Sequence, residues 1–153
     1  MDISFYEVTG EIFERPVCQL IEKAYQTGKN TFVKVEDVNF QELINKTLWT
    51  FSQKSFIPHG SALDPFPEKQ PVFISSTENN VNNSKILISV GSEYKDIKGF
   101  ERVIIVFAHD SNFQKELCRS LYLKYKELYG GMKYYKQNIK GIWELSHGSK
   151  VTN

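Results

Sequence analysis

Hydrophobic residues recur with two different periods in the first fifty positions of the chain. Residues 3–8 (ISFYEV) and 31–35 (TFVKV) are rich in β-branched and aromatic side chains, which predicts two strands. After each of them, apolar residues recur three and four positions apart, which predicts two helices. The first helix lies between Pro16 and Gly28 with Val17, Leu20, Ile21 and Ala24 on its apolar face. The second follows a cap-like pair, Asn39 and Glu42, and carries Phe40, Leu43, Ile44 and Leu48 on one face.

Three almost wholly apolar segments dominate the second half. They follow residues 58–71, which hold four of the five prolines and are therefore expected to form an extended loop without a helix. The segments are PVFIS (71–75), KILISV (85–90) and RVIIVF (102–107), and each predicts a buried strand. A last long helix is expected from about Ser111 to Leu128, ended by Gly130 and Gly131. Strands alternating with helices predict a three-layer, Rossmann-like α/β domain, with a predominantly parallel sheet between helices on both faces.

Length and composition fit one soluble domain. We expect residues 1–145 to form it and the polar residues after Trp143, taken as a flexible tail over 146–153, to fray. A net charge of +1 disfavours tight binding of DNA through its phosphates. No segment approaches the roughly 18 to 20 apolar residues of a membrane span, and the N-terminus lacks the features of a secretory signal. The expected location is the cytoplasm, without membrane contact.

The usual chemistry of such folds is missing. The turn after the first strand reads VTGEIFERP, with one glycine and two glutamates where a phosphate-binding loop needs several glycines. Cys18 and Cys118 lack metal-ligand spacing and are expected to be reduced packing residues. His59 and His109 occupy loop-like positions without a recognisable catalytic partner in the sequence. We therefore predict no catalytic residue, no cofactor and no metal site.

The final helix carries a pattern that does suggest binding. Lys115, Arg119, Tyr122 and Lys126 share one stripe, roughly 150° from a stripe of apolar residues expected to face the core. The apolar stripe consists of Phe113, Leu117, Leu121 and Leu128. The cationic stripe is either an ordinary solvated face or a receptor for an acidic peptide, because guanidinium and ammonium groups bind carboxylates and a tyrosine can line an apolar pocket.

Two aromatic residues stand out near the end of the second helix. Trp49 projects roughly 140° from the apolar face of that helix, and Phe56 follows seven residues later. Exposed aromatics close together mark protein interaction sites, although Trp49 could instead fold back over the helix end.

These residues resemble a known family, the chi subunit of bacterial DNA polymerase III. The resemblance rests on Leu48-Trp49, on the run Ser55-Phe56-Ile57-Pro58-His59, on ILIS at 86–89, on the Lys115, Arg119, Tyr122 pattern and on Trp143. It extends from the strand at Phe5 and Tyr6 to Trp143. The Asn-rich segment STENNVNNS, Lys126 in place of an arginine, and the residues past Trp143 depart from the family pattern.

The resemblance implies a non-catalytic accessory subunit that links the clamp loader to single-stranded DNA-binding protein. It implies that Lys115, Arg119, Tyr122 and Lys126 receive the acidic C-terminal tail of that protein, which ends in a hydrophobic residue and a free carboxylate. It also implies that Trp49 and Phe56 bind the psi subunit or another replication or repair protein, and that DNA is contacted only indirectly. Two alternatives remain: a small-molecule enzyme using His59 or His109 as a base, and a direct single-strand binder stacking bases on Trp49 and Tyr122.

Overall fold

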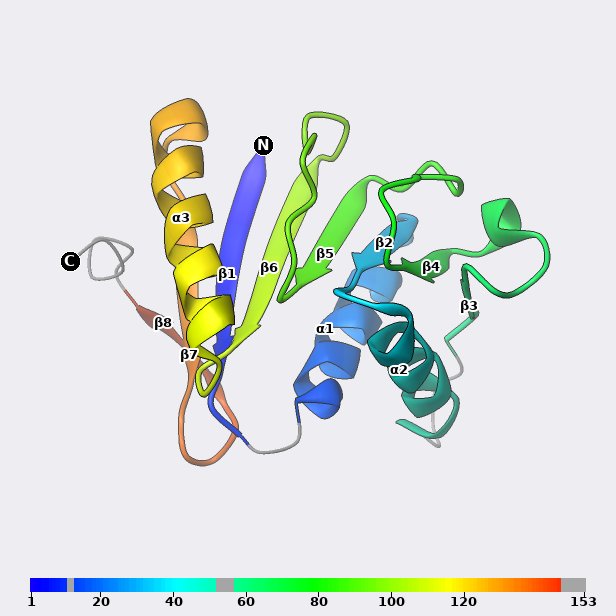
Figure 1. Cartoon of the computed structure of the whole chain (residues 1–153), viewed down its shortest axis with the longest axis horizontal. Coiled ribbons are helices and arrows are strands. Elements are labelled where there is room, and N and C mark those ends of the chain that lie inside the picture. The colour runs from blue at the N-terminus through cyan, green and yellow to red at the C-terminus, as the bar shows by residue number, and fades with distance from the viewer. Residues whose placement is uncertain (11–12, 52–56, 147–153) are drawn as a thin grey trace.

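The chain forms a three-layer α/β fold around a single mostly parallel sheet. The computed structural model describes residues 1–10, 13–51 and 57–146 (Figure 1). The three α-helices of these residues are α1 (Glu14–Gln26), α2 (Val38–Phe51) and α3 (Asn112–Tyr129). The strands are β1 (Asp2–Val8), β2 (Thr31–Lys34), β3 (His59–Ser61), β4 (Val72–Ser75), β5 (Ile86–Val90), β6 (Arg102–Ala108), β7 (Lys133–Gln137) and β8 (Trp143–Ser146). A short 3-10 helix, Pro67–Lys69, precedes β4.

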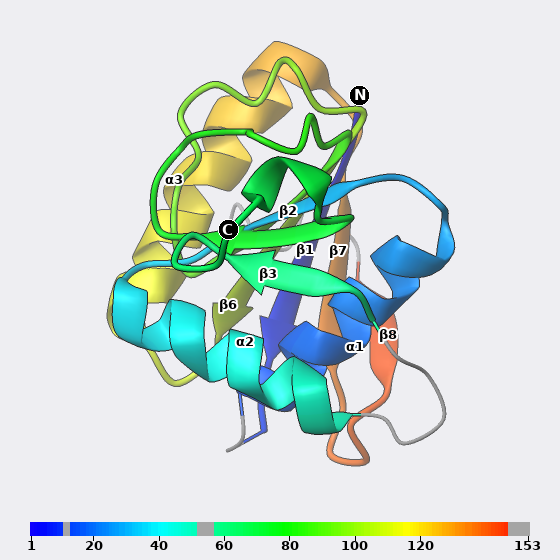
Figure 2. The ribbon, with the colours of Figure 1, turned by 90° about the vertical axis from the view of Figure 1, so that its right-hand side faces the viewer.

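The strand order is β3-β4-β2-β5-β6-β1-β7-β8, and only the β7–β8 pair is antiparallel. Helices α1 and α2 lie on one side of this sheet and α3 on the other (Figure 2). Every residue of β2, β4 and β5 is buried, as expected for parallel strands covered on both faces. The three-layer Rossmann-like prediction is therefore confirmed.

Two separate cores fill the layers. Side chains of Val8, Val33, Ile88 and Val106 pack beneath α1 and α2. On the opposite face, Phe5, Phe32, Leu87 and Ile105 pack beneath α3 together with the loop that carries Tyr94, Ile97 and Phe100. Cys18 and Cys118 are free and buried, one in each core, and burial raises the pKa of the Cys18 thiol to about 12. Both thiols are packing groups, as the sequence predicted.

The rotation of α3 differs from the prediction. Its buried residues are Cys118, Leu121, Tyr122 and Tyr125, whereas Phe113 is 68% exposed and Leu128 is 62% exposed. The predicted core stripe was therefore wrong for Phe113 and Leu128. The prediction failed because periodicity alone treats leucine and phenylalanine as core residues, while the sheet below offers aromatic partners to tyrosines: the rings of Phe5 and Tyr122 lie 5.3 Å apart.

Other local predictions also needed correction. The amide of Phe40 is capped by the carboxylate of Asp37, at 2.8 Å, rather than by the Asn39 and Glu42 pair. The proline-rich stretch contains the short strand β3 and a 3-10 turn. Residues 144–146, expected to fray, belong to β8, while the remainder of the predicted tail, 147–153, lies outside the described residues.

The Asn-rich segment forms a hydrogen-bonded connection at the amino ends of the central strands. The amide nitrogen Nδ2 of Asn82 donates to the carbonyl of Gln70 at 2.8 Å, and Asn30 donates to the carbonyl of Asn82 at 2.8 Å. The hydroxyl of Ser84 donates to Oδ1 of Asn82 at 2.5 Å. Asn82 is buried, so its side chain satisfies backbone groups that would otherwise lack partners.

A buried carboxylate attaches β7 to the rest of the sheet. Glu7 of β1 accepts hydrogen bonds from the hydroxyl of Tyr134 and from Nδ1 of His109, and Nζ of Lys136 lies 3.9 Å from its Oε2. Burial and the hydrogen bond to Glu7 raise the pKa of Tyr134. Because β7 carries β8, this cluster supports the whole outer part of the sheet.

We predict that Glu7→Gln lowers the free energy of unfolding by about 2 to 3 kcal/mol, since hydrogen bonds to a charged acceptor contribute more than neutral ones. Urea denaturation followed by circular dichroism measures this change. Glu127→Gln, at an exposed position of α3, is the control and should leave the midpoint within the experimental error. Equal midpoints for the two variants would show that Glu7 does not stabilise this part of the sheet.

Candidate functional site

The cations of α3 lie on the side of the helix that faces the outer strands. The hydroxyl of Ser111 caps the helix by accepting from the amide of Gln114 at 3.1 Å, and Oε1 of Gln114 accepts from the amide of Ala108 at 2.8 Å. One side of α3 is held by Lys124, whose Nζ is 3.3 Å from Glu93 in the loop after β5. At about 100° per residue, Lys115, Arg119 and Lys126 project roughly 140° to 180° away from Lys124. They therefore face the β7–β8 side, and we call these three residues the cationic flank.

The cationic flank is accessible. The side chain of Arg119 is 55% exposed, and its nearest carboxylate is that of Glu116, 4.0 Å away one turn earlier. Lys126 is exposed and Lys115 is partly buried. Among the described residues, neither lysine has a carboxylate within 4.0 Å. Three cations with so little internal neutralisation attract an acidic ligand.

Tyr122 does not lie beside these cations at the surface. It is 4% exposed, packs on Phe5 and belongs to the core beneath α3, where burial raises the pKa of its hydroxyl. The prediction of a solvent-facing stripe that includes Tyr122 was therefore wrong. Tyr122 instead holds the helix in the rotation that directs the cationic flank outward.

A second candidate surface surrounds Trp49, which is 56% exposed. Its ring packs against the ring of His59, with centroids 4.7 Å apart. We call the adjacent hollow of about 470 Å³ the Trp49 groove; it is lined by Asn45, Trp49, Pro58, His59, Asp64, Pro65, Phe66 and Gln70. Trp49 is thus exposed, as its position off the helix stripe predicted, while Phe56 lies outside the described residues.

Phe66 was missed by the sequence reading. It is largely exposed in the groove, with the ammonium of Lys69 5.1 Å from its ring centroid and a left-handed backbone at φ 55°. A bulky residue rarely adopts this conformation. Its position between Pro65 and Pro67 was the available signal, because prolines on both sides restrict how the chain can turn.

His59 is part of the structure of this surface and not a base. Its Nδ1 lies 2.7 Å from the carbonyl oxygen of Ile57, and its Nε2 lies 3.0 Å from that of Asn45. Both nitrogens lie within hydrogen-bond distance of a backbone carbonyl, and a neutral imidazole donates its single N–H to one of them. The ring thus lies between α2 and β3. The other candidate base, His109, has a partner that the sequence did not reveal, the buried Glu7 of β1. Burial raises the pKa of the nearby Cys118 thiol, which makes this thiol a poor nucleophile.

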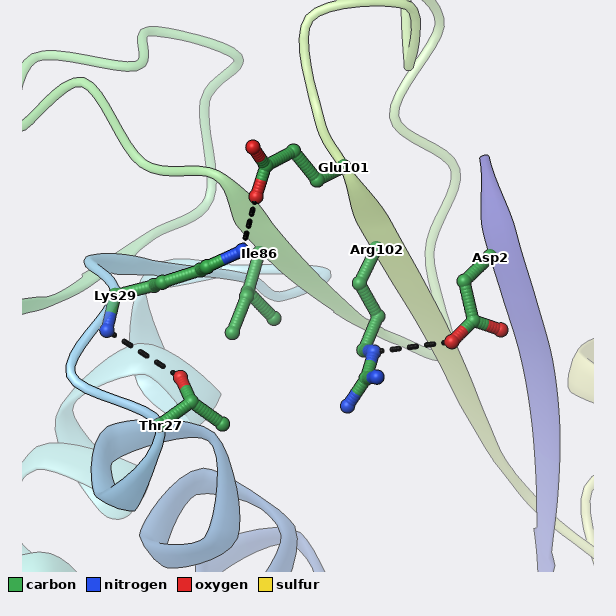
Figure 3. Close-up of a pocket in the computed structure, with 6 residues that line it drawn as sticks. All are labelled: Asp2, Thr27, Lys29, Ile86, Glu101 and Arg102. Carbon is green, nitrogen blue, oxygen red and sulfur yellow. Dashed lines mark hydrogen bonds and ion pairs between the residues drawn. The ribbon is translucent and has the colours of Figure 1, made fainter.

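A small hollow at the amino ends of β1, β5 and β6 offers no clear ligand chemistry (Figure 3). It has a volume of about 220 Å³ and is lined by Asp2, Thr27, Lys29, Ile86, Glu101 and Arg102. Its charges are already paired: Lys29 contacts Glu101 at 2.5 Å, and Nε of Arg102 contacts Asp2 at 3.2 Å (Figure 3). The hydrogen bond and charge of Lys29 lower the pKa of Glu101. The hollow also lies at the amino ends of the strands, whereas sheets of this kind usually bind small molecules at the carboxyl ends.

The described residues carry no cluster of three or more potential metal ligands, and no helix among them could cross a membrane. Trp49 and Tyr122 belong to helices on opposite faces of the sheet, and Tyr122 is buried. Tyr122 is therefore not available as the stacking platform that the alternative of a direct single-strand binder expected.

Comparisons with known proteins agree with the resemblance inferred from the sequence. The family model of the DNA polymerase III chi subunit, HolC, matches residues 1–131. The probable DNA polymerase III subunit chi of Rickettsia prowazekii (strain Madrid E) is 40% identical over 113 residues, covering 67% of this chain and 67% of the relative. The DNA polymerase III subunit chi of Escherichia coli (strain K12) is 25% identical over 114 residues, covering 74% of this chain and 78% of the relative. The chain therefore belongs to the family of DNA polymerase III chi subunits, non-catalytic accessory subunits of that holoenzyme.

Proposed function

We propose that this chi subunit links the clamp loader to single-stranded DNA-binding protein by binding the acidic C-terminal tail of that protein on the cationic flank. The observation that carries the proposal is the cluster of Lys115, Arg119 and Lys126 on one accessible side of α3, with a single carboxylate of the described residues within 4.0 Å of it. A guanidinium at its centre suits a carboxylate ligand because it can donate two parallel hydrogen bonds.

The expected affinity is modest. Exposed ion pairs contribute about 1 kcal/mol or less each, and burial of one apolar side chain at the end of the tail contributes about 1.5 to 3 kcal/mol. Together these terms give at most about 6 kcal/mol, which corresponds to a dissociation constant on the order of tens of micromolar or weaker, and this constant increases with salt. Many tails on a coated single strand would provide avidity, while each contact could still release as the polymerase moves. Tyr122 contributes indirectly, because its packing on Phe5 sets the rotation of α3.

The second proposed contact uses Trp49, Phe56 and the Trp49 groove to bind the psi subunit or another replication or repair protein. Trp49 is exposed at the opposite end of the sheet from β8, so this partner would not compete with the tail. A partly exposed tryptophan beside prolines and Phe66 is typical of an anchor for a protein partner.

We predict that Arg119→Ala weakens binding of an acidic tail peptide by about tenfold or more, because a charge-assisted pair is lost. Isothermal titration calorimetry measures the affinity, and an unchanged melting temperature shows that the fold is intact. Arg15→Ala serves as the matched control, since Arg15 is an exposed arginine of α1 on the opposite face. Equal affinities for Arg119→Ala and the parent would remove Arg119 from the site.

Trp49→Ala should abolish capture of the second partner from a replication complex while leaving tail affinity within about twofold of the parent, as expected for independent sites. A pull-down of the tagged chain with purified clamp-loader proteins, combined with calorimetry on the tail peptide, separates the two activities. Loss of tail binding in this variant, with the fold intact, would contradict the assignment of two independent surfaces.

A further inference from the structure

A small polar hollow lies on the face of the sheet opposite α3 and has no role in the sites described above. It has a volume of about 130 Å³ and is lined by Asp2, Ser4, Tyr6, Arg102, Ile104, Lys133 and Tyr135. These residues belong to β1, β6 and β7, and the side chains of Tyr6 and Ile104 pack with the core beneath α1 and α2. We call this site the strand hollow. It lies on the other face of the sheet from the cationic flank and is independent of it.

The register of three strands brings the lining side chains together. Ser4 of β1 is paired with Ile104 of β6 on one side and with Lys133 of β7 on the other. Alternate residues of a strand share a face, so the next row on this face holds Tyr6 beside Tyr135. The rings of these two tyrosines stack at 4.7 Å. The polar groups of both rows therefore meet in one place.

Three hydroxyl groups of the strand hollow lack a hydrogen-bond partner among the described residues. They belong to Ser4, Tyr6 and Tyr135. Ser4 is only 8% exposed, so its side chain is largely shielded from bulk water. Burial raises the pKa of the Tyr6 hydroxyl; Tyr135 raises it further and Arg102 opposes the rise, so this hydroxyl lies near both groups. Shielded hydroxyls are usually hydrogen-bonded, and these three point to an acceptor that the described residues do not supply.

The charges of the strand hollow favour an anion. The guanidinium of Arg102 contacts Asp2 through Nε at 3.2 Å (Figure 3), which leaves its terminal N–H groups as further donors. Among the described residues, Arg102 has no second carboxylate within 4.0 Å, and the exposed Lys133 has none. Two cations against one carboxylate leave the hollow with a net positive charge.

We propose that the strand hollow binds a phosphate group. The hydroxyls of Ser4, Tyr6 and Tyr135 donate hydrogen bonds to its oxygens, and Arg102 and Lys133 supply charge. A tetrahedral phosphate offers acceptor oxygens in several directions, whereas a carboxylate is planar and suits a single bidentate donor. Donors that converge from three strands therefore fit a phosphate better than a carboxylate.

Free phosphate and the phosphate of a nucleotide or of a single DNA strand share this chemistry. The surface beside the hollow favours a nucleotide. Leu145, 66% exposed, is paired with Tyr135 on this face, and the ring of Trp143 meets that of Tyr6 edge-on at 5.0 Å. An aromatic and apolar surface next to a phosphate site suits a sugar and a base. Weak binding of one phosphate does not need the basic excess that tight binding of long DNA requires, so it is compatible with the net charge of +1.

Titration of the isotopically labelled chain, followed by amide chemical-shift changes, tests the site with inorganic phosphate, thymidine monophosphate and oligothymidylate. Each titration is run at constant ionic strength, and sodium acetate is the carboxylate control. The proposal predicts changes at Ser4, Tyr6, Lys133 and Tyr135 with the phosphate probes and smaller changes with acetate. Equally large changes with acetate, or no change at these four residues with any phosphate probe, would overturn the proposal.

The three phosphate probes also identify the source of the phosphate. Tighter binding of thymidine monophosphate than of inorganic phosphate, reduced by Leu145→Ala, assigns the hollow to a nucleotide. A further increase in affinity with oligothymidylate assigns it to a DNA strand. Equal affinities for the three probes support a site for the phosphate group alone.

Tyr135→Phe and Lys133→Gln test the two kinds of contact. Tyr135→Phe keeps the ring beside Tyr6 and removes only the hydroxyl, so it should weaken binding of each phosphate probe by about tenfold. Lys133→Gln removes one exposed charge and should weaken binding by about twofold to fivefold. The matched control Lys140→Gln, at an exposed position between β7 and β8, should leave the affinity unchanged.

Melting temperatures equal to that of the parent show that the variants are folded. Parental affinity in folded Tyr135→Phe, together with equal affinities for the two lysine variants, would overturn the assignment of the phosphate to the strand hollow.

Discussion

Packing of α3 against β1 and β6 sets the orientation on which the proposed tail site depends. Tyr122 and Tyr125 are held in an aromatic core with Phe5 and Phe107, and this packing fixes the rotation of the helix about its axis. A helix turned by one residue, about 100°, would carry Arg119 out of its position facing the outer strands. Buried tyrosines thus determine a surface to which they contribute no exposed area.

The sheet order separates the two proposed binding surfaces. The Trp49 groove adjoins β3 at one edge, whereas the cationic flank lies on α3, which packs over β1 and β6 on the other face of the sheet. Under the proposed function, this separation would let each partner bind without displacing the other. Strands β2, β4 and β5, in which every residue is buried, provide a rigid connection.

The sequence predicted most of the helices and strands because most of them follow from one local signal, the spacing of apolar residues along the chain. The apolar strands at β2, β5 and β6, and the helix bounded by Pro16 and Gly28, agree with their predicted positions to within one or two residues. The outer strands β7 (KYYKQ) and β8 (WELS) escaped notice because both are short and neither contains an apolar run; β7 has two buried residues and β8 has none. The helical stripe of α3 was misassigned because tyrosine is amphipathic, and only its neighbours on the sheet decide whether it is buried. The partnership of Glu7 and His109, 102 residues apart, has no local signal at all.

Titration of the isotopically labelled chain with an acidic tail peptide, followed by amide chemical-shift changes, tests the central claim most directly. The account predicts the largest changes along α3 from Lys115 to Lys126, with little change at Trp49 or in β3. Changes confined to the Trp49 groove, or spread over α1 and α2 with none on α3, would contradict it.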